Sequence, residues 1–297
     1  LGDTPDAYGV WVLYPWRNTL VHLLPKAEFQ ELRTNRNDHK ITRDEQAVLG
    51  AMTIGVVGLS VGSASALTLV QEGIGSELRL ADFARLELSN LNRVRATVLD
   101  LGLPKTVITA RAIAELDPFV NVAIESDGIT DENLGEFLDG LDLLIEECDG
   151  LAMKLLLREQ ARARRIPVVM ETSDRGMLDI ERFDLEPDRP LLHGLVGDLS
   201  SQALRELTTY EKIPPVLRTM GAQTLSARMG ASMVDIDTNL TTWPQLASAV
   251  ALGGALNAEA ARRIGLGAHT RSGRFYTDFD SVFDMDGGVA VPPPEPR

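Results

Sequence analysis

The sequence feature that most constrains the fold is a series of short apolar runs separated by helical patterns. The runs are rich in Val, Ile and Leu and occupy residues 52–58, 77–83, 120–126, 141–148 and 166–172. Helical patterns lie between them, near 63–73, 104–118, 131–139 and 151–164. Continuous apolar strands that alternate with helices are typical of a parallel sheet covered on both faces. We therefore predict an α/β, doubly wound, Rossmann-like sheet that is mostly parallel in its N-terminal half.

The segments that flank this pattern are less regular. We interpret residues 1–40 as an irregular arm that lies on the body of the molecule. TRDE at 42–45 has the capping-box pattern that starts a helix. Residues 174–190, which are rich in charge, Gly and Pro, are interpreted as a long excursion. The elements expected in a mixed C-terminal half are two helical regions and a late strand, at 211–236, 243–264 and 274–280.

The composition limits the class of protein and its partners. At 297 residues, 44% hydrophobic and 24% charged, the chain is typical of a soluble globular protein. No apolar run approaches the roughly 18 residues that a membrane span needs. The net charge of −14 argues against nucleic acid or an anionic membrane as a partner. We expect one main domain at 41–285, followed by a proline-rich linker or tail at 286–297.

A single cysteine, Cys148, excludes an intrachain disulfide and a multi-cysteine zinc site. We therefore expect a reducing, cytoplasmic location and no zinc. Cys148 closes an apolar run, where a buried thiol packs as a small apolar group.

A glycine-rich turn follows the first apolar run. It reads GLSVGS over 58–63 and leads into a helix, which is where a doubly wound fold binds phosphates. The full G-x-G-x-x-G pattern is interrupted, because Gly58 is followed by Ser60 and Ser63, with Gly62 one place early. Asp82 ends the second strand 24 residues after Gly58, near the spacing of a carboxylate that binds ribose hydroxyls. A tight structural turn and a capping role for Asp82 are the alternatives.

The next segment, LELSNLNRVRATVLDLGLPK at 86–105, carries polar and cationic residues in a half-apolar context. Asn90, Asn92, Arg93 and Lys105 lie within twenty residues. Reaction at a nucleoside triphosphate needs cations around the phosphates, whereas a nicotinamide or flavin dinucleotide site needs little beyond the glycines and the ribose acid. These cations favour a triphosphate, unless they are solvated charges on an acidic surface.

The ordered set of glycine turn, strand-ending Asp, SNLNR and PK resembles the ThiF/MoeB/HesA family, which is related to the adenylation domain of ubiquitin-activating enzymes. The resemblance extends over about residues 33–282. It implies binding of ATP and Mg²⁺, and adenylation of the C-terminal carboxylate of a small ubiquitin-like protein or peptide with release of pyrophosphate. It also implies a homodimer.

The same resemblance implies roles for individual residues. Asp82 matches the ribose-binding acid, and Gly58, Ser60, Gly62 and Ser63 occupy the phosphate turn. Asn90 and Arg93 match the polar residues beside the phosphates, and Lys105 matches the lysine that neutralises them. Asp149 matches the aspartate that handles magnesium. Arg36 matches the arginine that reaches into the partner subunit's site.

Some features depart from the family pattern and leave two further hypotheses open. The interrupted glycine turn is compatible with a degenerate, non-catalytic module that binds a partner peptide. Nothing after Cys148 could form a thioester. The phrases VGLSVGS, EECD and METSDRGMLDIERFDLEPDRP resemble members fused to a nitroreductase-like domain, which keeps an NAD- or flavin-binding redox module as an alternative.

Overall fold

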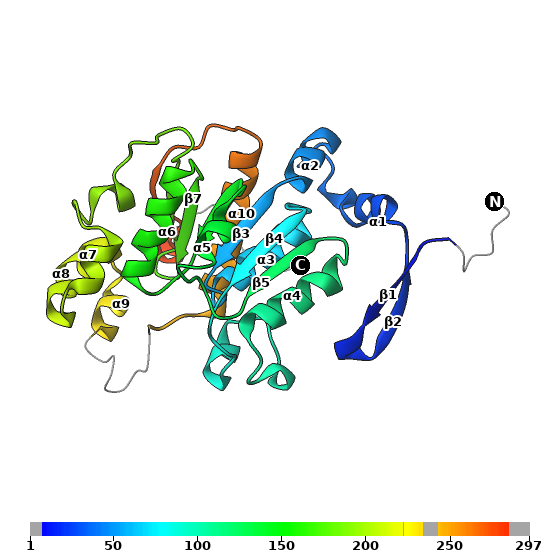
Figure 1. The fold of residues 1–297 in the computed structure, drawn as a ribbon, viewed down its shortest axis with the longest axis horizontal. Helices are drawn as coiled ribbons and strands as arrows, with labels where there is room; N and C mark the ends of the chain where they lie inside the picture. Colours follow the sequence, from blue (N-terminus) through cyan, green and yellow to red (C-terminus); the bar gives the residue numbers. More distant parts are fainter. Residues whose placement is uncertain (1–7, 222, 234–242, 285–297) are drawn as a thin grey trace, which may run out of the picture.

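The computed structural model describes residues 8–221, 223–233 and 243–284. A seven-stranded sheet of order β5-β4-β3-β6-β7-β8-β9 forms its centre (Figure 1). Its first five strands by sequence, all parallel, are β3 (Thr53–Val57), β4 (Glu77–Ala81), β5 (Asn121–Glu125), β6 (Leu143–Glu146) and β7 (Val168–Thr172). Strands β8 (Met177–Glu181) and β9 (Gly273–Tyr276) continue the sheet in antiparallel pairing. The predicted doubly wound fold with a mixed C-terminal half is confirmed.

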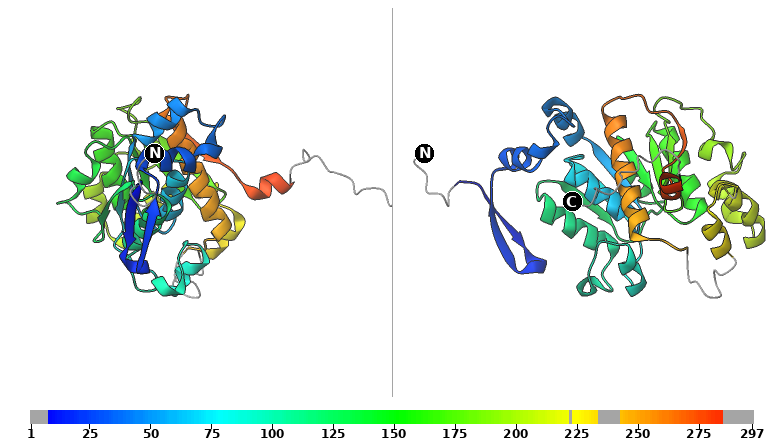
Figure 2. Two further views of the ribbon diagram at one scale, coloured as in Figure 1. Left: turned by 90° about the vertical axis from the view of Figure 1, so that its right-hand side faces the viewer. Right: turned by 180° about the vertical axis from the view of Figure 1, so that it is seen from behind.

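Helices cover both faces of the sheet. One face carries α3 (Gly62–Gln71), α4 (Lys105–Leu116) and α10 (Ala247–Gly265), and Figure 2 shows α10 beside the sheet in the view from behind. The other face carries α5 (Leu134–Leu138), α6 (Leu151–Ala163) and α7 (Ser201–Glu206). Two short helices follow α7, namely α8 (Thr209–Met220) and α9 (Ala227–Ser232), and α11 spans Phe279–Asp284. The 3₁₀ turns are η2 (Pro15–Arg17), η3 (Asn35–Asn37), η4 (Leu88–Asn92), η5 (Val98–Asp100) and η6 (Leu191–Gly194).

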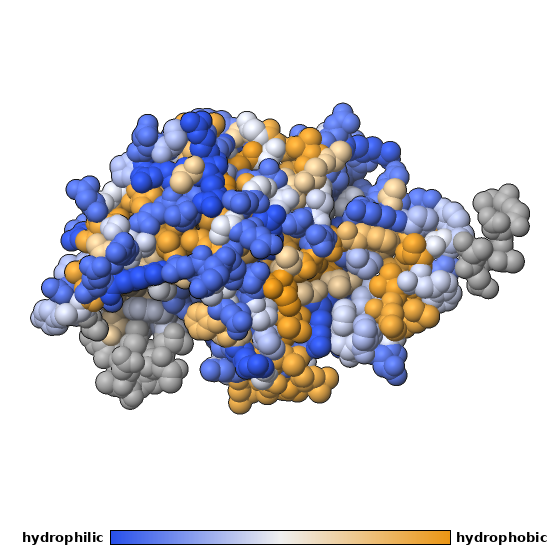
Figure 3. Space-filling view, in the orientation of Figure 1, coloured by the Kyte–Doolittle hydropathy of each residue, from blue (hydrophilic) through white to orange (hydrophobic). Residues whose placement is uncertain are grey.

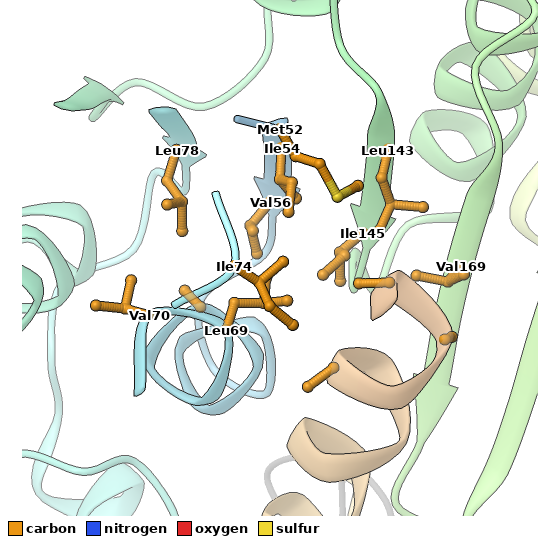
Figure 4. Packing of buried hydrophobic residues seen from close by; sticks show 14 of the residues in the cluster. Met52, Ile54, Val56, Leu69, Val70, Ile74, Leu78, Leu143, Ile145 and Val169 are labelled. Carbon is orange, nitrogen blue, oxygen red and sulfur yellow. The ribbon is translucent and has the colours of Figure 1, made fainter. Parts of the chain in front are cut away.

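Strand alternation divides the core into two layers. Ile54 and Val56 of β3 pack with Leu69 of α3 and with Ile74, which follows that helix, in the first cluster (Figure 4). Val57 points to the opposite face and belongs to the second cluster. Strands β3, β6 and β7 are therefore buried on both faces, which explains their continuous apolar runs, whereas the edge strand β5 is largely exposed.

The N-terminal arm is regular, so its interpretation as irregular was wrong. Strands β1 (Val10–Tyr14) and β2 (Thr19–Leu23) form an antiparallel hairpin at one end of the molecule (Figures 1 and 2). Its turn is fixed to α4, because Arg17 binds Glu115 at 2.8 Å. Helices α1 (Lys26–Arg33) and α2 (Arg43–Gly50) follow. The predicted capping box at Thr42 and Glu45 is confirmed.

The region 174–190, expected to be an excursion, contains strand β8, so this interpretation was also wrong. Asp179 lies in the middle of the strand, Glu181 ends it, and both are almost fully buried. Arg274 binds Asp179 at 2.7 Å, and Arg158 forms buried ion pairs with Glu146 and Glu181. These partners come from other elements, so the sequence of β8 alone reads as polar.

The expected C-terminal elements differ in detail. The helical region at 211–236 is divided into α8 and α9 with a break around Gly221, which is left-handed at φ 71°. The late strand stops at Tyr276. Residues 286–297, expected to be a linker or tail, lie outside the described residues. No helix in the described part of the chain is long and apolar enough to cross a membrane.

Candidate nucleotide-binding site

The glycine turn lies between the end of β3 and the start of α3. Gly58 has a φ of 90°, and a Cβ there would come within 2.4 Å of the Glu147 carbonyl oxygen, so only glycine fits. Among the described residues, the amides of Ser60 and Val61 have no hydrogen-bond acceptor. Unpaired amides at a helix N-terminus attract anions. The turn therefore presents two free amides of the kind that can bind an anion.

Asp82 lies directly after β4 and holds the turn in place. Its Oδ2 accepts a hydrogen bond from the amide of Leu59 at 2.6 Å, and its Oδ1 accepts one from the amide of Ala84 at 2.6 Å. The side chain is 9% exposed. An ionised carboxylate has about four acceptor positions, so both oxygens can still accept a hydrogen bond from a ligand hydroxyl.

Arg93 lies over the same turn. Its Nε donates to the Ser60 hydroxyl at 3.2 Å, and Nη1 donates to Oδ1 of Asn92 at 2.8 Å. Burial lowers the pKa of the Arg93 guanidinium, and the negative charge of Asp149 acts in the opposite direction. Arg93 is therefore a half-buried cation that is hydrogen-bonded to the glycine turn and is influenced by the charge of Asp149.

Asn90 and Lys105 differ in their surroundings. The Asn90 Oδ1 accepts a hydrogen bond from the Glu87 amide at 3.1 Å, so this buried side chain stabilises η4. Lys105 is 9% exposed and begins α4. No hydrogen bond or ion pair involves its ammonium group among the described residues, and it borders a narrow hollow with Ser63. Lys105 is thus a nearly buried cation beside the start of α3.

Ser63, the second serine of the interrupted pattern, is buried. Its hydroxyl donates to the Ser60 carbonyl oxygen at 3.2 Å. Gly62 is the first residue of α3, and a Cβ there would come within 2.8 Å of the Val56 side chain. Both residues therefore shape the turn from inside.

Asp149 is exposed and follows β6. Asp149 does not cap α6, because the N-cap position of that helix is Gly150. Asp149 borders a cavity of about 210 Å³, here called the Asp149 cavity. This cavity lies at the carboxyl ends of β6 and β7 and is closed by α8, α9 and the segment before α10. In open α/β sheets, ligands bind in this crevice.

Two buried glutamates under the Asp149 cavity were missed by the sequence analysis. The Glu147 Oε1 accepts hydrogen bonds from the Glu171 amide at 3.0 Å and from Asn257 Nδ2 at 2.8 Å. The Glu171 carboxyl group is 3% exposed and has no hydrogen-bond partner among the described residues. Burial raises the pKa of Glu147 to about 8, and burial together with the Glu147 charge raises that of Glu171 to about 9. The sequence does show a carboxylate at the end of each of these two apolar runs, and this pattern could have indicated the pair.

Cys148 lies between these groups without an evident chemical role. Its amide donates to Glu146 Oε1 at 2.6 Å, and burial raises the pKa of its thiol well above the usual range. A thiol held protonated is a poor nucleophile.

The structure does not bring Arg36 to this site. Arg36 lies on η3, between α1 and α2, and its side chain is exposed. These helices lie at the edge of the sheet where the parallel strands begin, opposite the loop at 84–104 that carries Arg93 (Figure 1). Within one chain, Arg36 therefore lies where the parallel strands begin, and the glycine turn lies where they end.

The chain is similar in sequence to proteins of one family. The sequence profile of the ThiF family matches residues 33–284. A Mycobacterium tuberculosis protein named "Uncharacterized protein MT1398" is 52% identical over 274 residues, or 92% of this chain, and the chain spans 38% of its length. The molybdopterin-synthase adenylyltransferase of Haemophilus influenzae is 28% identical over 56% of this chain and 70% of its own.

Solved structures have the same fold. The Escherichia coli tRNA N6-threonylcarbamoyladenosine dehydratase in complex with AMP has a TM-score of 0.58 at 18% identity, covering 80% of this chain and 95% of its own. Escherichia coli MccB in complex with MccA-N7isoASN has a TM-score of 0.58 at 15% identity, covering 85% and 73%. At these identities the similarity extends to the fold alone.

Proposed function

The chain belongs to the ThiF family, and from this membership we propose that it is an ATP-dependent adenylyltransferase. Its substrate is the C-terminal carboxylate of a small ubiquitin-like protein or peptide. A carboxylate oxygen attacks the α-phosphorus of ATP, the bond from that phosphorus to the bridging oxygen breaks, and pyrophosphate leaves. The products are an acyl-adenylate and pyrophosphate. Relatives named adenylyltransferases and solved neighbours that hold AMP or ATP support this proposal.

The observation that carries the proposal is the hydrogen bond that holds Arg93 against Ser60 of the glycine turn. A carboxylate and a triphosphate are both anions, so their approach needs a cation between them. Lys105 supplies a second, nearly buried cation beside the start of α3. A redox dinucleotide site does not require such cations, so their placement favours ATP over NAD or flavin.

Each remaining residue has a role that its contacts support. The amides of Ser60 and Val61 bind phosphate oxygens at the start of α3, and Asp82 accepts hydrogen bonds from the ribose hydroxyls. Asn90 keeps η4 in the conformation that directs Arg93 toward the turn. The rate enhancement then comes from positioning and electrostatic stabilisation, with no protein nucleophile.

Magnesium fits this site as an ion that arrives with the nucleotide. No group of three or more His, Cys, Asp or Glu side chains among the described residues could hold a metal by itself. Mg²⁺ commonly uses one or two carboxylates together with substrate phosphates and water. Asp149 is an exposed carboxylate beside Arg93 and would supply the protein ligand. The ion would neutralise phosphate charge.

We also propose a homodimer in which Arg36 acts in the partner subunit's site. Arg36 lies on the opposite side of the sheet from its own turn, which suits a role in a second chain. Exposed apolar side chains on the hairpin, Trp11, Leu13 and Leu20, offer surface for such a contact. Figure 3 shows apolar residues gathered over β1 and β2 and along the lower edge. Leu88, Val98 and Leu99 of the loop at 84–104 are also exposed.

Three alternatives can be compared with this proposal. Some relatives are named tRNA threonylcarbamoyladenosine dehydratases, but a net charge of −14 disfavours tRNA as a substrate. The similarity to members fused to a nitroreductase-like domain remains a prediction, and with it an NAD- or flavin-binding role. A degenerate binding module would keep the fold without the reaction.

Calorimetric titration with ATP–Mg²⁺, NAD⁺ and FMN, together with ATP–pyrophosphate exchange, tests the proposal. We expect binding of ATP–Mg²⁺ alone. At about 100 times its dissociation constant the ligand would stabilise the fold by roughly 2.7 kcal/mol, a few degrees in melting temperature. Binding of NAD⁺ or FMN without ATP would overturn the proposal in favour of a redox module. Absence of all binding would favour the degenerate module.

A further inference from the structure

The Asp149 cavity adjoins the segment that carries the proposed phosphate-site cation. Asp149 borders the cavity, and its charge acts on Arg93. Asn92, next to Arg93, donates from Nδ2 to the carbonyl oxygen of Gln245 at 2.8 Å, and Gln245 is part of the cavity wall. If a substrate carboxylate attacks a phosphate beside Arg93, the side chain of the substrate's terminal residue would therefore lie next to this cavity.

The walls of the cavity carry large apolar side chains from segments far apart in the sequence. They are Leu151 at the start of α6, Val216 and Met220 on α8, Met229 on α9, and Trp243 before α10. The enclosed volume is about 210 Å³. A substrate that ends in glycine would leave this apolar surface in contact with water. An apolar side chain that enters the cavity removes this apolar surface from water, which makes the free energy of binding more favourable.

The floor of the cavity disfavours an acidic substrate residue. Glu147, Asp149 and Glu171 all border it. A further carboxylate placed beside them would be repelled by Asp149 and would lose its hydration. Among the described residues that line the cavity, Lys154 is the one cation, and it is already bound to Glu146 at 3.1 Å. Among uncharged substrate side chains, the Leu, Val, Met and Trp residues of the wall favour an apolar one.

We propose that the Asp149 cavity binds the terminal residue of the carboxylate substrate and selects an apolar side chain, of about leucine size, in preference to glycine. This inference rests on the proposed adenylation function and adds the substrate class. The carboxylate faces Arg93 and the nucleotide, and its side chain lies against Leu151, Val216 and Met220.

Acyl-adenylate analogues test the inference directly. The probes are acylsulfamoyl adenosines whose acyl group is N-acetylglycine, N-acetylleucine or N-acetylaspartate, with ATP titrated in parallel by calorimetry. We expect the leucyl analogue to bind about 10- to 100-fold more tightly than the glycyl analogue, the range that burial of one apolar side chain supplies. The aspartyl analogue should bind more weakly than the leucyl one.

Variants of residues that line the Asp149 cavity test whether the preference for the leucyl analogue arises there. Val216→Phe fills the cavity and should abolish the leucyl advantage while leaving ATP affinity unchanged. Ile213→Phe is the matched control, because Ile213 lies on the same helix but is 44% exposed and does not border the cavity. If Val216→Phe fails to fold, Val216→Ala should enlarge the cavity and lower the leucyl preference.

The possible outcomes separate this inference from the proposed function. Equal or tighter binding of the glycyl analogue, with ATP still bound, would overturn the apolar selection and leave adenylation intact. A leucyl preference that survives Val216→Phe would place the selection elsewhere and overturn the assignment to this cavity. Failure of ATP and of all three analogues to bind would overturn both proposals.

Discussion

The Nε of Arg93 donates a hydrogen bond to the Ser60 hydroxyl at 3.2 Å, so the cation over the turn is held by one of the two serines that interrupt the glycine pattern. Arg93 is half-buried and its other contacts come from its own segment, Asn92 and Ser89. Ser60 is thus the link between η4 and the turn. The serine that weakened the phosphate-binding prediction has a positioning function in the structure.

Replacement of Arg93 by Ala should lower the rate of ATP–pyrophosphate exchange by about 10²–10³, the usual effect of removing one preorganised electrostatic donor. The melting temperature should change little, because Arg93 makes only short-range polar contacts. Arg95→Ala is the matched control, since Arg95 is exposed two residues along the same loop. Equal loss in both variants would mean that Arg93 acts through the net charge of the loop.

Replacement of Ser60 by Gly should lower exchange about 3- to 10-fold, because one hydrogen bond that orients Arg93 is lost. A degenerate site would respond in the opposite direction, with activity rising as the glycine pattern is restored. In the Arg93→Ala background the Ser60→Gly change should have no further effect. Steady-state exchange rates of the two single variants and the double variant measure this coupling.

The sequence was sufficient for the parts of the structure that depend on neighbouring residues. Strands β3, β6 and β7 are buried on both faces, and all five parallel strands could be identified from their own residues. Strand β8 could not, because Asp179 and Glu181 are neutralised by Arg274 and Arg158, which lie far away in the sequence. The hairpin at the N-terminus was missed because one face of its strands is exposed and apolar, without the alternation of a half-buried sheet.

The site shows the same division. Gly58, Asp82 and Arg93 come together because consecutive loops follow adjacent parallel strands. Their roles toward a nucleotide remain predictions. The Glu147–Asn257 hydrogen bond joins the end of β6 to α10 across 110 residues. Such a contact depends on tertiary packing, which local motifs do not encode.

Arg158 links two buried carboxylates on different strands, and its loss should destabilise the fold strongly. It is fully buried and pairs with Glu146 and Glu181. Arg158→Met would leave both carboxylates without their guanidinium partner, so we expect a loss of about 3–5 kcal/mol in the free energy of unfolding. Urea denaturation measures the loss. Arg162→Met on the same helix, where one bond to the Arg189 carbonyl is removed, should cost less than about 1.5 kcal/mol.

The raised pKa of Glu171 predicts a pH-dependent stability. Burial and the neighbouring Glu147 raise this pKa to about 9, so the folded state holds a proton that the unfolded state releases above about pH 4.5. The associated stability is present below that pH and is lost as pH rises toward 9, with a slope of up to about 1.4 kcal/mol per pH unit. Unfolding free energies at pH 5, 6.5 and 8 should therefore fall more steeply for the natural chain than for Glu171→Gln. The exposed Glu136→Gln control should keep the steep slope, and parallel slopes in all three proteins would contradict the prediction.

Mixing two inactive variants tests whether Arg36 acts in the partner subunit's site. Arg36→Ala and Arg93→Ala should each lower exchange activity strongly, and Arg36→Ala should leave ATP affinity nearly unchanged. In a mixed dimer, one site combines the intact Arg93 of one subunit with the intact Arg36 of the other, and the second site lacks both. Random reassociation of equal amounts makes half of the dimers mixed, so activity should recover to about one quarter of the natural level.

The same experiment identifies the alternative. If Arg36 acted within its own subunit, every site in the mixture would lack one of the two arginines and no activity would return. The control is a mixture of Arg36→Ala with an Arg36→Ala/Arg93→Ala double variant, in which no combination of subunits restores a complete site. Recovery in the first mixture and not in the second would show that Arg36 and Arg93, which lie on opposite sides of the sheet in one chain, meet only across a subunit interface.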